Sequence, residues 1–502
     1  MTNPLFDALF APNIGSERPF LILADRSQIS YAAFLRQAAQ MANALTSLGL
    51  VAGDRVAVQV EKSPQALALY AACVQSGLVF LPLNTGYTTH ELSYFLENSG
   101  ASLLVCGGAQ EAELSSLAPR VLTLEGDGSG SLVDLSARQQ KVFDTVPREA
   151  NDLAALLYTS GTTGRSKGAM LSQRNLLSNA EVLKECWHFS PDDVLLHALP
   201  IFHTHGLFVA TNITLLAGCS MVFLPKFDID QMISALPRAT TMMGVPTFYT
   251  RLLDDARFTK ELAAGMRLFI SGSAPLLAET HKQFEALSGH RILERYGMTE
   301  TNMNTSNPYD GDRRAGTVGL PLPGVELKIT DPDTGALLSN GEVGQIEVRG
   351  DNVFQGYWQM PKKTADELRE DGFFITGDLG LIDEQGYVQI VGRGKDLIIS
   401  GGYNIYPKEV ELVLDAQPGV LESAVIGVPD SDFGEAVLGV IVPEPNADIQ
   451  TDAIMEAARN ELARFKHPRR LIILDNLPRN AMGKVQKNVL RETLKSALKA
   501  TQ

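Results

Sequence analysis

Short apolar runs alternate with longer, helix-length segments along roughly the first 300 residues of this chain. The runs at 55–60, 78–83 and 102–106 have the length of strands, whereas residues 30–49 have the length and spacing of a helix. Continuous apolar runs are typical of buried strands, and their alternation with helices is typical of parallel sheets. The sequence therefore predicts an α/β fold.

The pattern changes near residue 315, from long segments to short apolar pieces separated by turn residues. Residues 324–350 show this spacing, which predicts β-hairpins. Beyond residue 396, helix-length and strand-length segments mix again and indicate a small α+β domain. A chain of 502 residues is also too long for one hydrophobic core. We expect a large N-terminal domain at 1–394, with a β-rich subdomain at about 315–394, and a C-terminal domain at 396–502.

The chain carries 43 Lys and Arg residues against 58 Asp and Glu, a net charge of −15. This balance argues against broad adhesion to nucleic acid or anionic membranes, so a polyanionic ligand must bind at a local basic site. The four cysteines lack metal-site spacing and are expected to be free thiols of a reducing compartment. The sequence shows no secretory or transit pattern and no membrane-length apolar run. We expect a soluble, cytoplasmic protein that binds neither nucleic acid nor membrane.

A dense glycine, serine and threonine loop, YTSGTTGRSKG at 158–168, lies between an apolar run and a segment with helical character. Glycines let the backbone approach an anion, hydroxyl groups donate hydrogen bonds and a lysine adds positive charge. The spacing is not that of a Walker A loop, because Gly168 and not Ser or Thr follows Lys167. A flexible surface turn is the alternative. The density of the motif favours a phosphate site between a strand and a helix.

This loop resembles the signature of the adenylate-forming superfamily, which includes acyl-CoA synthetases, luciferases and the adenylation domains of peptide synthetases. Further motifs in the same order extend the resemblance from about residue 30 to 488. The resemblance implies an enzyme that activates a carboxylic acid with ATP and Mg²⁺ and passes the acyl group to coenzyme A. It also implies that the large domain binds AMP and the acyl group and that the small AMP-binding domain is mobile. The implied loop contacts to ATP are Thr159, Ser160, Gly161, Thr162, Thr163, Gly164 and Lys167.

Two further motifs of the large domain supply nucleotide contacts by resemblance. SGSAPL at 271–276 is similar to the segment along the adenine, and RYGMTE at 295–300 is similar to the motif at the α-phosphate and Mg²⁺. By resemblance, Glu300 and Thr159 are the implied metal contacts, and hard oxygen ligands suit Mg²⁺. Taken alone, Glu300 would be a surface acid. The implied nucleotide contacts are Gly272, Ser273, Ala274, Glu294, Tyr296, Gly297, Met298 and Thr299, of which Thr299 joins Glu300 and His203 as catalytic.

The small domain and its border contain the remaining active-site motifs. By resemblance, Asp378 and Arg393 contact the ribose, Lys395 is the hinge about which the domain rotates, and Lys484 contacts ATP. Lys484 ends the motif LPRNAMGK and is the implied catalytic lysine, because a cation is wanted where a carboxylate attacks a phosphate. A solvated surface lysine is the alternative. The residues implied to line the pantetheine channel of CoA are Gly401, Gly402 and Tyr403.

The acyl pocket is expected near two motifs that carry unusual basic residues. His203 and His205 lie in ALPIFHTHGLF, and Arg295 replaces a glycine that related enzymes commonly have before Tyr296. A bulky cation shortens the pocket and favours a second carboxylate on the substrate. Arg251 could share this task, and a structural ion pair with Glu294 or Asp254 is the alternative for either arginine. The expected acyl contacts are His203, His205, Arg251, Arg295 and Met298.

The whole chain resembles malonyl-CoA synthetases, which use malonate and often methylmalonate. The implied reaction converts malonate, ATP and CoA into malonyl-CoA, AMP and diphosphate through malonyl-AMP. The alternatives are a CoA ligase for another short-chain or aromatic acid, an adenylation enzyme that loads a carrier protein, and a non-catalytic nucleotide binder. By resemblance, a lysine acetyltransferase and deacetylase could also regulate Lys484 by removing and restoring its charge.

Overall fold

The computed structural model describes residues 2–159, 166–400, 403–430, 433–445, 447–480 and 483–495. The chain forms two compact units, the first made of residues 1–326 and 348–374, and the second of residues 327–347 and 375–502. The division passes through the stretch that the sequence predicts to be β-rich. The boundary and hinge at Lys395 stay predictions.

A six-stranded sheet in the first unit contains the three strands that the apolar runs predict. Its neighbouring strands are parallel except for β7 and β8, which pair antiparallel. Nearly all residues of β3, β4 and β5 are buried, which is why their sequences are continuously apolar. The strand order is β6 (Val121–Thr123), β5 (Leu103–Cys106), β3 (Arg55–Gln59), β4 (Val79–Pro82), β7 (Leu153–Thr159) and β8 (Lys167–Ser172).

A nine-stranded sheet forms the other layer of strands in this unit, with a parallel centre from β1 and β10 to β13. Strands β2, β14 and β15 join it antiparallel. The order is β15 (Leu320–Pro321), β14 (Asn302–Ser306), β13 (Leu293–Met298), β12 (Leu268–Ser271), β11 (Thr241–Gly244), β9 (Val194–His197), β10 (Ser220–Phe223), β1 (Pro19–Ile22) and β2 (Gln28–Ser30).

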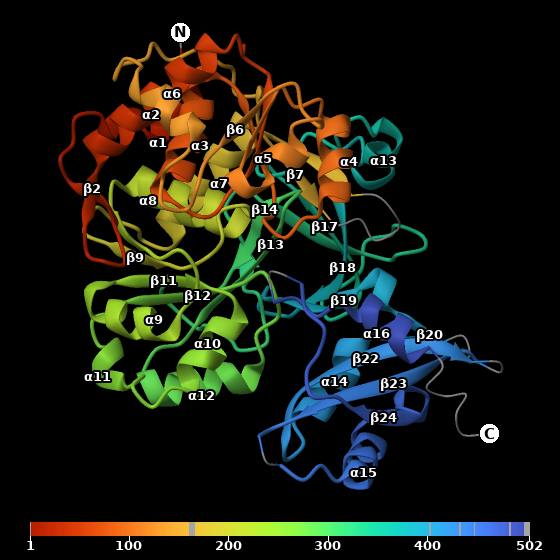
Figure 1. Ribbon diagram of the computed structural model, residues 1–502. Helices are drawn as coiled ribbons and strands as arrows, with labels where there is room; N and C mark the ends of the chain where they lie inside the picture. The colour runs from red at the N-terminus through yellow and green to blue at the C-terminus, as the bar shows by residue number, and fades with distance from the viewer. Residues whose placement is uncertain are drawn as a thin grey trace. The chain divides into compact units, whose positions relative to one another are not determined.

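Helices pack beside both sheets, as α10 and α12 do beside β11 and β12 (Figure 1). The predicted helix at 30–49 is α2 (Tyr31–Ser47), which begins where the Ser30 side chain accepts a hydrogen bond from the Ala33 amide. The other α-helices of the first unit, with the π-helix η2, are α1 (Pro4–Leu9), α3 (Pro64–Ser76), α4 (Thr89–Ser99), α5 (Gly108–Leu114), α6 (Ser131–Ala137), α7 (Gln173–Cys186), η2 (His205–Thr211), α8 (Asn212–Ala217), α9 (Ile229–Ala235), α10 (Pro246–Leu253), α11 (Lys260–Ala263), α12 (Ala278–Ser288) and α13 (Pro361–Glu367).

The segment after the glycine-rich loop corrects one prediction. The loop was expected to lead from a strand directly into a helix, but β8 follows it and pairs with β7 as a hairpin. Helix α7 begins only at Gln173, because Ser172 and Asn175 form a reciprocal capping box there. The apolar residues before Ser172 therefore belong to a strand, and their burial in the sheet outweighs their helical propensity.

The second unit contains a five-stranded sheet in which β22, paired with β23, buries both of its faces. Along β22, Val425 packs into one apolar cluster with α14 and α15, while Ala424 and Ile426 pack into another with Leu490 of α16. This alternation explains why the sequence reads as strands and helices mixed. The elements are β20 (Ile398–Ser400), β21 (Tyr403–Ile405), α14 (Pro407–Asp415), β22 (Val420–Asp430), β23 (Gly434–Pro443), α15 (Thr451–Glu461), β24 (Arg470–Ile473) and α16 (Lys487–Leu494).

A four-stranded sheet also falls mostly within the second unit, as the hairpin spacing near 324–350 predicts. It consists of β16 (Glu326–Thr330), β17 (Gly344–Arg349), β18 (Phe374–Ile382) and β19 (Val388–Arg393). The α/β fold class, with parallel sheets in a large N-terminal part and a small α+β C-terminal part, is therefore confirmed. All four cysteines are free thiols, as predicted. Among the described residues, no helix combines the length and the apolar character that a membrane span requires.

Candidate functional site

A polar network in the first unit joins β7, β8 and α13. The Lys167 ammonium lies 3.2 Å from Glu367 Oε2 and 4.1 Å from the centre of the Tyr357 ring. The Tyr357 hydroxyl donates to Glu367 Oε2 at 2.7 Å and lies 3.1 Å from Glu300 Oε1. Thr159 Oγ1 lies 3.4 Å from the same oxygen of Glu300. Three residues that the motifs single out, Thr159, Lys167 and Glu300, thus meet in one network.

The oxygen atoms of this network suit a divalent cation that is shared with a ligand. Burial alone would raise the pKa of Glu367, but hydrogen bonds from Lys363 and Tyr357 and the charge of Lys167 lower it overall. Thr159 and Glu300 supply the hard oxygen atoms that Mg²⁺ prefers. In the described part of the chain, no three His, Cys, Asp or Glu side chains form a metal cluster. Mg²⁺ fits here if phosphate oxygens complete its shell.

Five of the predicted loop contacts cannot be placed in this network. They are Ser160, Gly161, Thr162, Thr163 and Gly164, which lie outside the described residues.

Arg295 on β13 is a deeply buried cation. The residue is 3% exposed, and its Nε and Nη2 atoms have no hydrogen-bond partner among the described residues. Its guanidinium fills the space beside Gly272, where a Cβ atom would lie 2.4 Å from Arg295 Cζ. Burial lowers the pKa of Arg295 to about 9, so the side chain stays charged near neutral pH. The ion pair with Glu294 or Asp254 does not form, and Glu294 instead lies 3.7 Å from His281 Nδ1.

His205 approaches the same segment from the π-helix η2. Its Nδ1 lies 3.2 Å from Ser273 Oγ, and its Nε2 has no partner in the described part of the chain. Burial, and next the charge of Arg295, lower the pKa of His205 well below its ordinary value. The imidazole is therefore neutral, with one donor and one acceptor nitrogen. Arg295 and His205 bring unsatisfied polar atoms to one place, Gly272–Ser273.

The other expected acyl contacts differ in environment. Burial lowers the pKa of His203 to about 4, and its ring lies 4.9 Å from that of Phe202. Met298 ends β13 and is partly buried. Arg251, by contrast, is exposed on α10, with its guanidinium 5.5 Å from the centre of the Phe227 ring. The environment of Arg251 is therefore unlike that of Arg295.

The remaining predicted nucleotide contacts of this unit lie after β12 and along β13. Gly297 has no room for a side chain, because a Cβ atom would lie 1.9 Å from the carbonyl oxygen of Asn302. Burial raises the pKa of the Glu294 carboxyl. The residues gathered here are Gly272, Ser273, Ala274, Glu294, Tyr296, Gly297, Met298 and Thr299.

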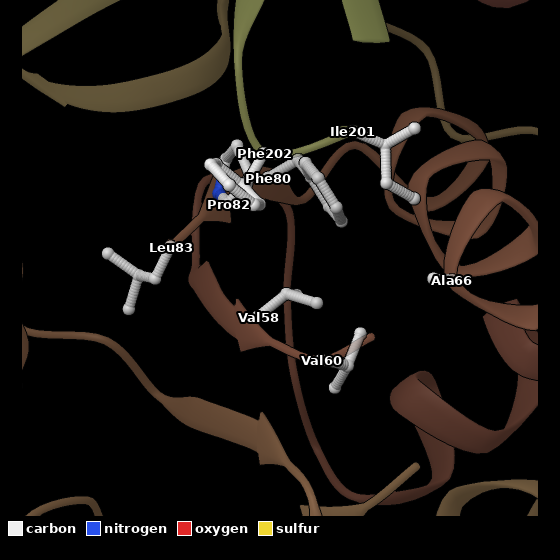
Figure 2. Close-up of a pocket in the computed structure, with 8 residues that line it drawn as sticks. All are labelled: Val58, Val60, Ala66, Phe80, Pro82, Leu83, Ile201 and Phe202. Atoms are coloured by element: carbon white, nitrogen blue, oxygen red, sulfur yellow. The ribbon is translucent and has the colours of Figure 1, made fainter. Parts of the chain in front are cut away.

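Figure 2 shows a small pocket elsewhere in the first unit, and its lining is entirely apolar. A carboxylate would find no hydrogen-bond donor among these side chains. We therefore do not assign this pocket to an acidic substrate. The lining residues are Val58, Val60, Ala66, Phe80, Pro82, Leu83, Ile201 and Phe202.

A second charged cluster forms within the second unit. Strands β18 and β19 pair Asp378 with Arg393, whose Nε lies 2.6 Å from the Asp378 carboxylate. Lys484 is an exposed residue, yet its pKa is lowered to about 8, first by desolvation of the ammonium and then by the charge of Arg393. Lys395 adds to this effect, and its own pKa is lowered mainly by burial. The predicted ribose, hinge and catalytic residues of this unit are thus neighbours.

The expected CoA contacts are only partly described. Tyr403 is exposed and stacks on Phe465 at a ring distance of 4.6 Å. Gly401 and Gly402 lie outside the described residues.

Two residues of the Lys167 network were missed by the sequence motifs. Tyr357 and Glu367 contact Lys167 and Glu300 directly, but each is a single residue outside any recognised motif. Helix α13 buries none of its residues, so no apolar spacing tells a partner of Lys167 from a surface acid there.

The chain is similar to known proteins over nearly its whole length. The chain is 57% identical to the ATP-bound MatB of Rhodopseudomonas palustris, with a TM-score of 0.97 and coverage of 99% of this chain and 100% of that one. It is 27% identical to an o-succinylbenzoate CoA synthetase from Bacillus subtilis in complex with its acyl-adenylate, with a TM-score of 0.84 and coverage of 99% and 98%. A malonate–CoA ligase of Arabidopsis thaliana is 36% identical over 89% of this chain and 79% of its own length.

Two family models match the chain in sequence order. Residues 12–358 match the AMP-binding enzyme model, and residues 409–484 match the C-terminal domain of AMP-binding enzymes. The first match alone covers more than half of the chain, and the chain therefore belongs to the family of AMP-binding enzymes.

Proposed function

We propose that the chain is an AMP-forming malonyl-CoA synthetase, an acid–thiol ligase that joins malonate to CoA at the expense of ATP. The observation that carries this proposal is the buried guanidinium of Arg295, whose Nε and Nη2 atoms have no partner in the described structure. A carboxylate can accept two parallel hydrogen bonds from such a group, and a diacid has a second carboxylate to offer. The malonate–CoA ligase among the relatives supports the same substrate. Methylmalonate carries the same two carboxylates, so the proposal includes it as a second substrate of the enzyme.

In the first half-reaction, one malonate carboxylate attacks the α-phosphorus of ATP, which forms malonyl-AMP and releases diphosphate. Lys167 binds the phosphates, and Thr159 and Glu300 would hold Mg²⁺. When bound, Mg²⁺ neutralises phosphate charge. Arg295, with His205, holds the distal carboxylate. Both reactants are anionic, so the work of these side chains is to orient them and to offset their charge.

In the second half-reaction, the thiol of CoA attacks the malonyl carbonyl carbon, and AMP leaves. We assign Lys484 to the first half-reaction, where its ammonium offsets the charge between carboxylate and α-phosphate. Asp378 accepts hydrogen bonds from the ribose hydroxyls, with Arg393 beside it. Tyr403, Gly401 and Gly402 serve the pantetheine arm. Lys395 acts as the hinge, and the free thiols suit a cytoplasmic location.

Product identification tests the function directly. With malonate, ATP, Mg²⁺ and CoA, the enzyme should form malonyl-CoA, AMP and diphosphate in equal amounts. Diphosphate exchange across a panel of acids compares malonate and methylmalonate with acetate and benzoate. Strong exchange with acetate or benzoate and little with malonate would contradict the proposal. Adenylation without thioester formation on free CoA would indicate a carrier-protein enzyme instead.

Arg295→Met should raise the KM for malonate about a hundredfold, because truncating one partner of a buried charged pair costs roughly 2–5 kcal/mol. Selectivity for malonate over propionate, which lacks the distal carboxylate, should fall with it. The matched control is Arg251→Met, which removes an exposed arginine and should leave both quantities unchanged. Diphosphate exchange measures KM for both acids. An unchanged ratio in Arg295→Met with a lowered ratio in Arg251→Met would move the role to Arg251.

Lys484→Ala should slow adenylation by about 10²–10³-fold, as expected when a group that stabilises transition-state charge is removed. Thioester formation from supplied malonyl-AMP should change much less. Rapid-quench measurement of each half-reaction separates the two, and equal losses would contradict the assignment to the first.

We also propose that a lysine acetyltransferase and deacetylase control Lys484. Protein with acetyl-lysine incorporated at 484 should then match Lys484→Ala, and full activity of that protein would end the regulatory proposal.

The pKa of Lys484, lowered to about 8, predicts the pH dependence of adenylation. The ammonium is present below this pKa and is lost as the pH rises through it, so kcat/KM for malonate should fall above about pH 8. Lys484→Arg should lose part of the rate but keep its charge, because a guanidinium stays protonated. Diphosphate exchange between pH 6 and 10 measures both profiles. Because Arg295 has a pKa of about 9, Lys484→Arg should decline only at that higher pH, and a decline from about pH 8 in this variant would show that another group causes it.

A further inference from the structure

Lys62 is a buried lysine whose contacts in the described structure are with neutral groups. It follows β3 and is 9% exposed. Its ammonium donates to His197 Nδ1 at 2.8 Å and to the His197 carbonyl oxygen at 2.9 Å, and it lies 4.3 Å from the centre of the Phe223 ring. Among the described residues, no carboxylate lies within ion-pair distance of it. Burial lowers the pKa of Lys62 well below its ordinary value, and a buried amine held only by neutral groups costs stability, which points to a role beyond stability.

The ring of His197 connects Lys62 to a second segment, the one that contains Gly206. Its Nε2 lies 2.8 Å from the carbonyl oxygen of Gly206, and a carbonyl oxygen can only accept. The proton of the neutral ring therefore resides on Nε2, and Nδ1 is left as an acceptor for Lys62. Both ring nitrogens are thus committed, and the orientation of the buried ring is fixed.

Gly206 places His205, its neighbour in the π-helix η2. The Gly206 carbonyl oxygen also accepts a hydrogen bond from Thr211 Oγ1 at 3.0 Å. The chain approaches itself closely here, since a Cβ atom at residue 206 would lie 2.0 Å from the carbonyl oxygen of Pro200. Single π-helical turns are frequent at functional sites. A shift of the Gly206 carbonyl would therefore move His205.

A small apolar pocket lies beside the segment that precedes His205. The apolar pocket of Figure 2 lies between the ends of β3 and β4 and the side chains of Ile201 and Phe202. The side chains of Ile201 and Phe202 contact this pocket on one side, although Ile201 itself is buried. The polar contacts from Lys62 through His197 to Gly206 act together with the close approach of Gly206 to Pro200 in holding the segment that leads into His205.

We propose that Lys62 is a positioning residue for the acyl site. Through the ring of His197 it fixes the Gly206 carbonyl and so holds His205 against Ser273, beside the guanidinium of Arg295. This inference rests on the proposed function, because that function assigns His205 and Arg295 to the distal carboxylate.

The variant Lys62→Met removes the donor and keeps most of the side-chain stem. In diphosphate exchange, its KM for malonate should rise about tenfold to a hundredfold, as expected from a small displacement of a binding group, while its KM for ATP stays within about twofold. The matched control is Arg267→Met, which breaks the partly buried ion pair with Asp193. That control should lower the melting temperature without changing the KM for malonate.

A spectroscopic measurement needs no substrate. In protein labelled with ¹⁵N-histidine, Lys62→Met should shift the ring signals of both His197 and His205, which His197→Gln and His205→Gln assign. A shift of His197 alone, or an unchanged KM for malonate, would overturn the proposal. If Lys62→Met does not fold, His197→Gln replaces it, with the same expected changes in KM and in the His205 signal.

A double variant separates a relay from two independent defects. Lys62→Met should add nothing to the KM of His197→Gln if the two residues act through one contact. Additive increases would contradict the relay. Wild-type enzyme that exchanges another acid but not malonate would overturn the proposed function, while the histidine signals would still test the relay itself.

Discussion

The burial of the Arg295 guanidinium is the constraint on which the proposed acyl site depends. An ionised side chain costs several kcal/mol to remove from water unless an anion and hydrogen bonds compensate, and those of Arg295 are incomplete in the described structure. Gly272 leaves the space that the guanidinium fills, and the lowered pKa of His205 keeps a second positive charge from forming beside it. A carboxylate therefore completes this site, whereas an apolar acyl tail would leave the charge buried and unpaired.

In the network of Lys167, Glu367, Tyr357, Glu300 and Thr159, the protein itself supplies the carboxylate that neutralises the cation, which it does not do for Arg295 in the described structure. Glu367 neutralises Lys167, and the Tyr357 hydroxyl connects Glu367 to Glu300. A phosphate that binds Lys167 must compete with this carboxylate or share the lysine with it. The Tyr357 hydroxyl contacts both carboxylates but has a single proton to donate. A change in the charge or position of Glu367 therefore alters the contact that Tyr357 makes with Glu300. Phosphate binding and the geometry of the proposed metal ligands are therefore coupled.

The sequence predicted whatever was encoded in local patterns. The buried strands at 55–60, 78–83 and 102–106 and the helix at 30–49 were found because apolar spacing reports burial. The strand β8 was missed, since its pairing with β7 is a tertiary contact that overrides local propensity. Lys62, Tyr357 and Glu367 carried no motif, and only the fold brings them to His197, Glu300 and Lys167. A single residue whose partners lie far away in the sequence has no local pattern by which it can be predicted.

The overall charge shows why anionic ligands of this chain depend on basic residues grouped at short range. The chain has a net charge of −15, and malonate, ATP and CoA are all anions, so the long-range field opposes their approach. Affinity must then come from cations held together at short range. Arg393 and Lys395 crowd Lys484 enough to contribute to its lowered pKa. An anionic ligand bound there would relieve this repulsion and raise the pKa again, so ligand binding and protonation of Lys484 favour each other.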